Sequence, residues 1–368
     1  MQVADMGREP GAHLVDLISR ARLLELLEAI RRVRVGIAGD FTLDGYWYVD
    51  MECARLSREA PLYNHPVVRE TYSAGGCANV AVNVAALRPR ETWAFTVLGD
   101  DWRGPLLRQV LAEAGLELDG MLTQPGTWVT PFFGKVILMG LGNQQEDARL
   151  DFVNSLPLPD QVLSWMLDQI AGRLCELDAL IVADYQTVGV IPPRVVEALN
   201  DMAQATPRVV FAADSRDNIG QFSSMVVKPN EVEAAHMWFP GRQPGSVGPE
   251  VLAAAGMRAQ ADSGRPVYIT RGERGALLCA ATGSEAIPAI PVPPPIDTVG
   301  AGDTFLAALT TALAAQATPR EAGCLAALAA AVTIRKLRTT GTASPEEILE
   351  TYDRSVYGSG RQGLYPDS

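Results

Sequence analysis

The fold class follows from three consecutive segments: ALIVADY (179–185), PPRVVEALNDMA (192–203) and RVVFAAD (208–214). The first and third are short apolar runs, which are typical of buried strands in a parallel sheet. The segment between them repeats apolar residues at the spacing of one helix face. A strand, a helix and a second strand in this order predict a βαβ unit.

The same alternation extends over most of the chain. VRVGIAGD (33–40) is predicted to be the first buried strand, and TWAFTVLG (92–99) is a strand pattern followed by the helical pattern PLLRQVLAEAG (105–115). Further strand patterns lie at SMVVKPN (224–230) and PVYITRG (266–272). Strands spaced by helices predict an α/β fold in which a mostly parallel sheet is covered by helices on both faces, a three-layer α/β/α core.

Two segments interrupt this alternation, residues 45–72 and 127–152. Both are rich in aromatic and β-branched residues, and neither has a helical pattern. We interpret them as strands of a small extra sheet inserted into the core, which would serve as a lid or a dimer surface. The alternative is that they are edge strands of the main sheet.

The sequence therefore predicts one large domain over residues 33–352 that carries two lid segments. An N-terminal helical extension over residues 1–32 precedes it, because residues 14–32 repeat Leu and Ile at helical spacing and end in arginines. A flexible tail over residues 353–368 follows it, with the polar, glycine-containing end GSGRQGLYPDS.

The composition excludes several classes of protein. The chain has 368 residues, of which 48% are hydrophobic and 20% charged, so it is neither disordered nor collagen-like. Its formal charge of −12 argues against a nucleic-acid partner and against an anionic membrane surface. No apolar run reaches the roughly 18 residues of a membrane span, and the polar start MQVADMGREPGAH is unlike a signal peptide.

Cysteines and histidines point to a reducing compartment and away from a zinc site. The 5 cysteines are scattered without a CxxC pair, which is typical of reduced, mostly buried thiols in a cytoplasmic protein. The 3 histidines, at positions 13, 65 and 236, lie far apart, so neither a zinc site nor a histidine-based triad is expected.

The segment with the clearest chemistry is DTVGAGDTF (297–305), which precedes an apolar helical pattern. Its glycines let backbone N–H groups point into one concavity, and a helix N-terminus adds positive potential there, so the loop is suited to a phosphoryl group. Asp303 falls in the first helical turn beside this anion hole. A carboxylate in that place has a use if it takes a proton from an attacking hydroxyl, which is the minimum apparatus for phosphoryl transfer to an alcohol. The alternative is an ordinary loop with an acidic residue in the first helical turn.

At this point the chain resembles the ribokinase-like, or PfkB, carbohydrate kinases. DTVGAGDTF looks like the C-terminal signature of that family, and AGGCANVA (74–81) is similar to its second signature. GDFTLD (39–44), KPNEVEA (228–234) and ITRGERGALL (269–278) match further family segments in the right order. The resemblance covers about residues 33–350 and implies an ATP-dependent sugar kinase with a ribokinase-like fold.

A closer resemblance is to the heptose-7-phosphate kinase branch, the kinase half of the bifunctional ADP-heptose synthase. GDFTLDGYWY (39–48) is similar to the first strand and turn of that branch, and SREAP (57–61) looks like its S-P-E-A-P stretch. NQQ (143–145) followed by RLDF (149–152) resembles a segment that is rare elsewhere in the superfamily. Because no segment matches the nucleotidyltransferase half, the chain looks like a stand-alone kinase.

The resemblance assigns roles at the acceptor side of the site. Asp303 matches the catalytic base, and the anion hole is matched by Gly300, Ala301 and Gly302. Asp44 matches the aspartate that binds substrate hydroxyls; otherwise it is a surface turn residue. The expected sugar contacts are completed by Gly75, Gly76 and Asn79, whose segment also fits a small-residue helix start under the sheet. Lys135 and Arg149 are either ligands of a substrate phosphate or solvated lid charges.

The resemblance also assigns the nucleotide and ion sites. Asn230 and Glu233 match the N-x-x-E element that organises Mg²⁺ and its waters near the phosphates; Asn230 also suits a plain helix cap. Thr270 and Gly272 match the nucleotide-binding turn after a strand. Positions that hold a monovalent cation such as K⁺ in several family members are matched by Asp297 and the Val299 carbonyl.

Other acceptors and one other class of function remain as alternatives. The closest branch has a lysine after its Asp-Tyr strand end, whereas here Asp184-Tyr185 is followed by QTVG (186–189). The substrate could therefore be another sugar, such as a ketohexose or its phosphate, and the second class is a non-catalytic relative that binds a sugar phosphate or nucleotide. A homodimer through the lid is predicted from Tyr46, Trp47, Tyr48, Val67 and Val68.

Overall fold

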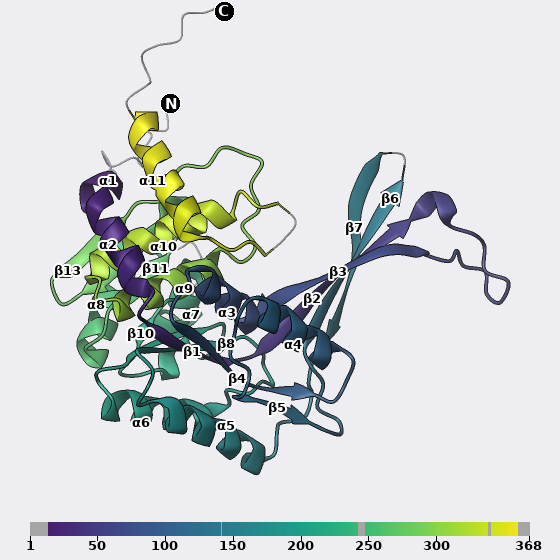
Figure 1. Cartoon of the computed structure of the whole chain (residues 1–368), viewed down its shortest axis with the longest axis horizontal. Coiled ribbons are helices and arrows are strands. Elements are labelled where there is room, and N and C mark those ends of the chain that lie inside the picture. Colours follow the sequence, from purple (N-terminus) through teal and green to yellow (C-terminus); the bar gives the residue numbers. More distant parts are fainter. Residues whose placement is uncertain (1–13, 141, 242–246, 338–339, 360–368) are drawn as a thin grey trace, which may run out of the picture.

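A nine-stranded sheet forms the centre of the computed structural model, which describes residues 14–140, 142–241, 247–337 and 340–359 (Figure 1). Its strand order is β13-β12-β11-β10-β9-β8-β1-β4-β5. All neighbouring strands are parallel except at one edge, where β12 runs antiparallel to β11 and to β13. The strands are β1 (Arg34–Gly39), β4 (Glu91–Gly99), β5 (Met121–Gln124), β8 (Ala179–Asp184), β9 (Val210–Ser215), β10 (Val226–Val227), β11 (Val267–Thr270), β12 (Ala276–Ala280) and β13 (Gly283–Ile287).

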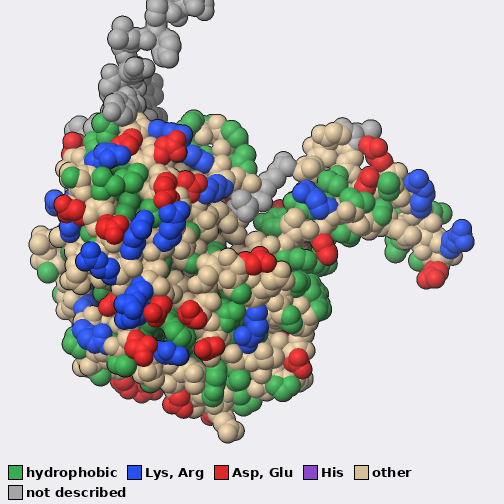
Figure 2. Space-filling model, in the orientation of Figure 1, with side chains coloured by type: hydrophobic (Ala, Val, Ile, Leu, Met, Phe, Trp, Pro, Cys, Tyr) green, Lys and Arg blue, Asp and Glu red, His purple; other side chains and the backbone are tan. Residues whose placement is uncertain are grey.

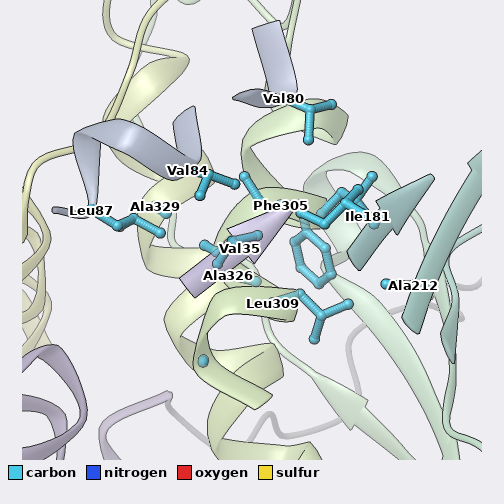
Figure 3. Packing of buried hydrophobic residues seen from close by; sticks show 14 of the residues in the cluster. Val35, Val80, Val84, Leu87, Ile181, Ala212, Phe305, Leu309, Ala326 and Ala329 are labelled. Carbon is cyan, nitrogen blue, oxygen red and sulfur yellow. The ribbon is translucent and has the colours of Figure 1, made fainter. Parts of the chain in front are cut away.

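Helices cover both faces of this sheet, as the sequence predicts. One face packs against α3 (Cys77–Ala86), α4 (Arg103–Glu113), α9 (Ala301–Ala314) and α10 (Pro319–Thr333), and the other against α5 (Asp160–Arg173), α6 (Pro193–Ala205), α7 (Glu231–Trp238) and α8 (Pro249–Ser263). Figure 3 shows the first of these interfaces, where Phe305 and Leu309 of α9 meet Val35 and Ile181 of the strands. The three-layer α/β/α prediction is confirmed.

A separate four-stranded sheet, the lid, has the order β3-β2-β6-β7. Its strands are β2 (Phe41–Asp50), β3 (Val67–Gly76), β6 (Phe132–Gly140) and β7 (Asn143–Phe152). The lid projects from one side of the body (Figures 1 and 2). The two irregular segments of the sequence therefore form an inserted sheet, and the alternative of edge strands in the main sheet is wrong. The strand β2 begins only one residue after β1 ends, so the lid is a continuation of a central core strand.

The two faces of the lid differ because side chains alternate along a strand. One face is aromatic: Trp47, Tyr72 and Phe152 surround Phe132, with ring centroids 5.4 to 6.3 Å from it, and Trp102 of the body joins them. The opposite face is polar and carries Asp44, Tyr46, Ser73, Lys135 and Arg149, as the strand register requires. The aromatic face attaches the lid to the body, which leaves the polar face for a ligand.

Within its described part, residues 14–32, the N-terminal extension forms two helices rather than the single predicted one. They are α1 (Leu14–Leu17) and α2 (Arg20–Ile30), and Ser19 caps α2 by accepting a hydrogen bond from Arg22 N. Arg20 forms an ion pair with Asp353 at 2.7 Å, which ties α2 to α11 (Pro345–Ser359). The helix α11 continues past residue 353, where the tail was expected to begin; residues 360–368 lie outside the described residues.

Surface and thiol features agree in part with the sequence interpretation. Within the described ranges no helix is both long and apolar enough to cross a membrane. All five cysteines are free, but Cys53 and Cys175 are exposed, so the expectation of mostly buried thiols holds for only three of them. Figure 2 shows positive and negative side chains interspersed over the visible face of the body.

Candidate active site

The candidate site lies where the carboxyl ends of the core strands meet the N-terminus of α9. Polar residues lie at these strand ends: Asp40 after β1, Tyr185 after β8, Asp214 one residue before the end of β9 and Lys228 after β10. In open α/β sheets this edge is where ligands bind, because the strand ends open into a crevice there. The lid strand β2 starts at the same edge, so its polar face lies beside these groups.

The N-terminus of α9 lies where the sequence predicts an anion hole, at Gly300, Ala301 and Gly302. Gly300 precedes the helix with φ +79°, a left-handed conformation that favours glycine. A side chain at this position would also collide with Asn79, because its Cβ would lie 2.7 Å from Asn79 Nδ2. The glycine therefore allows the amides of Ala301 and Gly302 to open the helix towards the crevice, where orphan N–H groups favour an anion.

Asp303 lies in the first turn of α9, and both of its carboxylate oxygens have a donor. Asn79 Nδ2 donates to Oδ2 at 2.7 Å, and the Tyr185 hydroxyl lies 3.0 Å from Oδ1. Burial raises the pKa of Asp303 to about 6, and the neighbouring Asp214 acts in the same direction, while the two hydrogen bonds oppose the rise. The carboxylate is thus ionised at neutral pH but is a stronger base than a solvated aspartate.

Asn79 is hydrogen-bonded within the protein at both ends of its side-chain amide. It is fully buried, its amide donates to Asp303, and its side-chain oxygen accepts from Asn83 Nδ2 at 3.1 Å. The oxygen of Asn83 in turn accepts from the Thr304 hydroxyl at 2.8 Å. This chain of amides fixes the orientation of Asp303; the direct sugar contact of Asn79 stays a prediction.

Three functional candidates at this site were missed by sequence reasoning: Tyr185, Asp214 and Lys228. Lys228 Nζ forms an ion pair with Asp214 Oδ2 at 3.0 Å, and both residues are buried. The same Nζ lies 3.7 Å from the position that a Cβ would take on Gly302, so a fixed positive charge lies beside the anion hole. The sequence signal that could have identified Lys228 is a lysine directly after an apolar strand pattern.

Asp40 holds the loop that carries Tyr185. Its buried carboxylate accepts hydrogen bonds from the backbone N–H groups of Tyr185, Gln186 and Val190 at 2.8 to 2.9 Å. Gly189 allows this approach, because a Cβ there would lie 2.2 Å from Asp40 Oδ1. Since three backbone N–H groups donate to one carboxylate, the loop is held in one conformation, and this fixes the backbone position from which the Tyr185 side chain extends.

At the lid side, Asp44 faces the site together with two other polar residues. Asp44 Oδ1, Thr42 Oγ1 and Ser73 Oγ are buried and lack a hydrogen-bond partner among the described residues. A Cβ on Gly75 would lie 2.0 Å from Asp44 Oδ1, so only glycine leaves this space open. Buried polar atoms without partners are costly unless a ligand or water completes them. Burial raises the pKa of Asp44 to about 6, against the opposing charges of Lys135 and Arg149.

Lys135 and Arg149 lie next to each other on the polar lid face, since they are paired across β6 and β7. Lys135 Nζ is 3.9 Å from Glu146 and 5.5 Å from the centre of the Tyr46 ring, while Arg149 forms an ion pair with Asp151 at 2.7 Å. A pocket of about 160 Å³ opens beside them between the lid and the loop before α9. Its lining consists of Tyr46, Tyr48, Lys135, Ile137, Gln144, Gln145, Glu146 and Asp297.

The residues expected at the nucleotide lie together at the ends of β10 and β11. Asn230 pairs with Thr270 as an isolated parallel bridge, and Gly272 follows in the next turn with φ +57°. Asn230 caps α7: its oxygen accepts from the N–H groups of Val232 and Glu233, and Glu233 Oε2 accepts from Asn230 N at 2.7 Å. The capping alternative for Asn230 is thus realised, which commits its oxygen and leaves Oε1 of Glu233 as the acceptor that can turn to a hydrated ion.

At the expected cation position, Asp297 and Val299 form a local turn. Val299 N donates to Asp297 Oδ1 at 3.1 Å, and Asp297 N donates to the carbonyl of Ile334 at 2.9 Å. This turn brings the Asp297 side chain to the lid pocket. The bound cation stays a prediction.

Solved structures with a similar fold identify the architecture of the chain. The potassium complex of phosphofructokinase-2 from Escherichia coli matches with a TM-score of 0.66 at 18% identity, covering 88% of this chain and 99% of that one. Arabidopsis thaliana ribokinase complexed with ribose and ATP matches with a TM-score of 0.64 at 19% identity, covering 87% and 98% of the two chains. The likeness establishes a ribokinase-like fold.

Sequence relatives are closer. The bifunctional protein HldE of Wolinella succinogenes is 30% identical over 346 residues, which are 92% of this chain and 69% of that protein. The protein of the same name from Caulobacter vibrioides is 33% identical over 319 residues, or 86% and 63% of the two chains. The chain thus spans about two thirds of the length of these relatives.

A family model adds the decisive match. The model of the pfkB family carbohydrate kinases matches residues 153–347, a range that contains the anion hole, Asp303, Lys228 and the capping residues of α7. Together with the relatives and the fold, this match shows that the chain belongs to the pfkB family of carbohydrate kinases and is an ATP-dependent sugar kinase.

Proposed function

We propose that the acceptor is a phosphorylated sugar, with a heptose 7-phosphate as the favoured candidate. The observation that carries this proposal is the arrangement of the polar lid face, where Asp44 and the unpartnered atoms lie near Asp303 and two cations lie farther out. Hydroxyl-binding groups at one end and positive charges at the other suit a sugar with an anionic group far from the reacting hydroxyl.

The strand register supports this spacing. Asp44 is paired with Phe133, and Lys135 lies two residues farther along β6, paired with Tyr46. Residues two apart on a strand are separated by about 6.7 Å, and the lysine side chain extends this reach. The glutamines of the 143–145 segment line the same pocket as Lys135, so they add amide donors beside the expected phosphate.

In the proposed mechanism, Asp303 takes the proton of the acceptor hydroxyl, which is the anomeric one for a heptose. The oxygen then forms a bond to the γ-phosphorus of ATP while the bond to ADP breaks. The amides at Gly300–Gly302 and the charge of Lys228 hold the phosphoryl oxygens as their charge grows. Closing of the lid over Asp44 excludes water, which limits hydrolysis of ATP.

Mg²⁺ and a monovalent cation complete the proposal. The oxygen set around Glu233 fits a hydrated Mg²⁺, because one of its carboxylate oxygens is not used by the helix cap. Bound there, Mg²⁺ would neutralise charge on the nucleotide phosphates. Asp297 and the carbonyl of Val299 are proposed to bind K⁺, with the turn at Asp297 presenting oxygens towards the loop.

A homodimer through the lid is also proposed, with a corrected surface. Tyr48 is buried and Trp47 packs in the aromatic cluster, so neither forms an outer surface. Val67 and Val68 stay exposed, at 51% and 55%. The connection between β2 and β3 adds further exposed apolar residues: Leu56, Leu62 and Tyr63. Light scattering after size-exclusion chromatography at micromolar concentration is expected to give twice the chain mass; a monomer would contradict the dimer.

We propose a cytoplasmic location. The five free cysteines support it, since exposed thiols such as Cys53 and Cys175 persist in a reducing compartment.

The test is ADP release over a panel of acceptors, run with the wild type and with Asp303→Asn. The panel contains a heptose 7-phosphate, the unphosphorylated heptose, fructose, fructose 6-phosphate and ribose. The proposal predicts the highest kcat/KM for the heptose phosphate and a loss of at least ~100-fold in kcat for the variant. A ketohexose or its phosphate as the best acceptor would overturn the heptose assignment, and near-normal turnover of Asp303→Asn would overturn the role of Asp303.

A further inference from the structure

The Tyr185 hydroxyl lies between two carboxylates of the site. Its oxygen is 3.0 Å from Asp303 Oδ1 and 2.9 Å from Asp214 Oδ2. A phenol has one proton, so it donates to only one of these oxygens at a time. Burial and the two carboxylates raise the pKa of Tyr185 well above its usual value, so the hydroxyl keeps its proton throughout.

We propose that Tyr185 is a positioning residue that controls the basicity of Asp303 by moving its hydrogen bond between Asp303 and Asp214. Before transfer the hydroxyl donates to the ionised Asp303 and holds it charged. When Asp303 receives the proton of the acceptor hydroxyl, the Tyr185 hydroxyl turns to Asp214, whose Oδ2 lies 3.0 Å from Lys228 Nζ. The inference rests on the proposed role of Asp303 as the base.

The surroundings make this exchange a rotation of one O–H bond rather than a movement of the ring. Asp40 fixes the backbone N–H of Tyr185 at 2.9 Å, and the guanidinium of Arg216 lies 5.4 Å from the ring centre. Lys228 holds Asp214 at 3.0 Å, so Asp214 has a donor whichever way the hydroxyl points. Asp303 likewise keeps the Asn79 donor at 2.7 Å. Each carboxylate therefore stays in place while the hydroxyl changes partner.

The proton balance needs no other participant. The acceptor loses its proton to Asp303, its oxygen bonds to the γ-phosphorus, and the bond from phosphorus to the ADP oxygen breaks. Tyr185 ends the step with its own proton. The other titratable and charged groups that face this cluster come from every packed element: Asp40 after β1, Asp44 on β2, Cys77 on α3, Asp184 on β8, Asp214 and Arg216 at β9, Lys228 after β10 and Glu233 on α7.

The test compares pH profiles of kcat/KM for the acceptor in three variants. Tyr185→Phe removes a donor to the charged base, so the acid limb should move to higher pH by roughly 0.5 to 1 unit. Asp214→Asn removes a neighbouring negative charge, so the acid limb should move to lower pH. Tyr268→Phe is the matched control, because it deletes another buried phenol hydroxyl, one that donates to Pro319 O at 2.7 Å away from the site, and its limb should not move.

Opposite shifts in the first two variants, with an unchanged KM for the acceptor in Tyr185→Phe, support the inference. A loss of activity in Tyr185→Phe that is equal at all pH values indicates a structural role and overturns it, as does a limb that stays in place. If Tyr185→Phe does not fold, the shift in Asp214→Asn decides alone: an unmoved or raised limb overturns the coupling. Asp303→Asn distinguishes failure of the proposed function from failure of this inference. Full activity in Asp303→Asn would overturn the role of Asp303 as the base. An inactive Asp303→Asn, combined with unmoved acid limbs in Tyr185→Phe and Asp214→Asn, would overturn only the role of Tyr185.

Discussion

The two ends of the site differ in how far their polar groups are hydrogen-bonded within the protein. Around Asp303 the two central carboxylates already have donors: Asn79 and Tyr185 bind Asp303, and Lys228 pairs with Asp214. On the lid, Asp44 Oδ1 is buried without a partner among the described residues, and β7 is exposed along almost its whole length. If Asp303 is the base and Asp44 binds the acceptor, as proposed, the catalytic end is hydrogen-bonded before the substrate binds, whereas the binding end gains its partners from the substrate.

This difference follows from the cost of rearranging charges. Groups that stabilise a transition state act best when they are already oriented, because reorientation during the reaction would consume the gain. Groups that recognise a substrate can leave atoms unpaired, since a ligand that lacks the matching hydroxyl then leaves a buried polar atom unsatisfied and binds poorly. Substitutions at the two ends should therefore affect kcat and KM differently.

The largest effect beyond Asp303 is expected at Lys228. Lys228→Met removes the fixed charge beside the anion hole, and the loss of one such stabilising group lowers kcat by about 100- to 1,000-fold. Stopped assays of ADP formation at saturating acceptor measure it. Lys336→Met is the matched control, because Lys336 pairs with Glu347 of α11 at 2.7 Å rather than with a carboxylate of the site, and its kcat should stay within about twofold.

Because Lys228→Met leaves Asp214 buried without its cation, the variant is also expected to unfold more easily by about 3 kcal/mol. The double variant Lys228→Met/Asp214→Asn should recover most of that stability in thermal melts. It should not recover kcat, and recovery of both would mean that Lys228 is only structural.

Asp44 should act mainly on acceptor binding. Asp44→Asn weakens charged hydrogen bonds to the sugar, each of which contributes about 1.5 to 3 kcal/mol, so kcat/KM should fall by about 10- to 100-fold while KM for ATP stays constant. Asp50→Asn lies on the same strand, where it caps the turn at the far end, and serves as the control. An equal fall in both variants would show that the lid had lost its structure.

The pH dependence should reveal two carboxylates. Burial raises the pKa values of Asp303 and Asp44 to about 6, and both groups must be ionised to accept hydroxyl protons. Since protonation removes the acceptor, kcat/KM should fall below pH 6 with a slope above one in the logarithmic plot, about tenfold or more per pH unit. In Asp44→Asn the slope should return to one. A wild-type slope of one would indicate that a single group controls the limb.

The smallest effect is expected at the outer lid. Lys135→Gln should raise KM for the phosphorylated acceptor by about 3- to 10-fold, because a partly exposed charge contributes roughly 1 kcal/mol. The unphosphorylated sugar is the control, and its KM should not change. Equal effects on both acceptors would place the substrate phosphate elsewhere.

The parts of the site that are contiguous in the chain could be predicted from the sequence. The 297–305 loop carries the proposed anion hole and the proposed base within one helical turn, so the sequence pattern alone places Gly300, Gly302 and Asp303 together. The lid was also recognised, because its aromatic and β-branched segments lack a helical pattern.

The remaining site contacts join residues that are far apart in the sequence, so no local sequence pattern predicts them. Tyr185, Asp214 and Lys228 follow three different strands, and only the parallel order β8-β9-β10 brings their side chains together. Asn79 illustrates the same limit. Its motif resembles a sugar-binding segment, but the sequence does not show its hydrogen-bond partners: Asp303 belongs to α9, and Asn83 lies one turn farther along α3. The break between α1 and α2 at Ser19 was missed because the apolar spacing continues across it.

The continuity of β1 into β2 has a mechanical consequence. The lid strands β2 and β3 connect to the core at one point: β2 begins directly after Asp40, β3 ends directly before Cys77, and Cys77 N donates to the carbonyl of Asp40 at 3.1 Å. A swing of the lid is then a rotation about a pivot at Asp40, and displacement grows with distance from it. At about 3.3 Å per residue, Asp44 lies roughly 13 Å along the lever and Asp50 roughly 33 Å. A movement that carries the tip by a given distance shifts Asp44 by less than half of it, so the residue nearest the chemistry stays almost aligned while the outer lid travels.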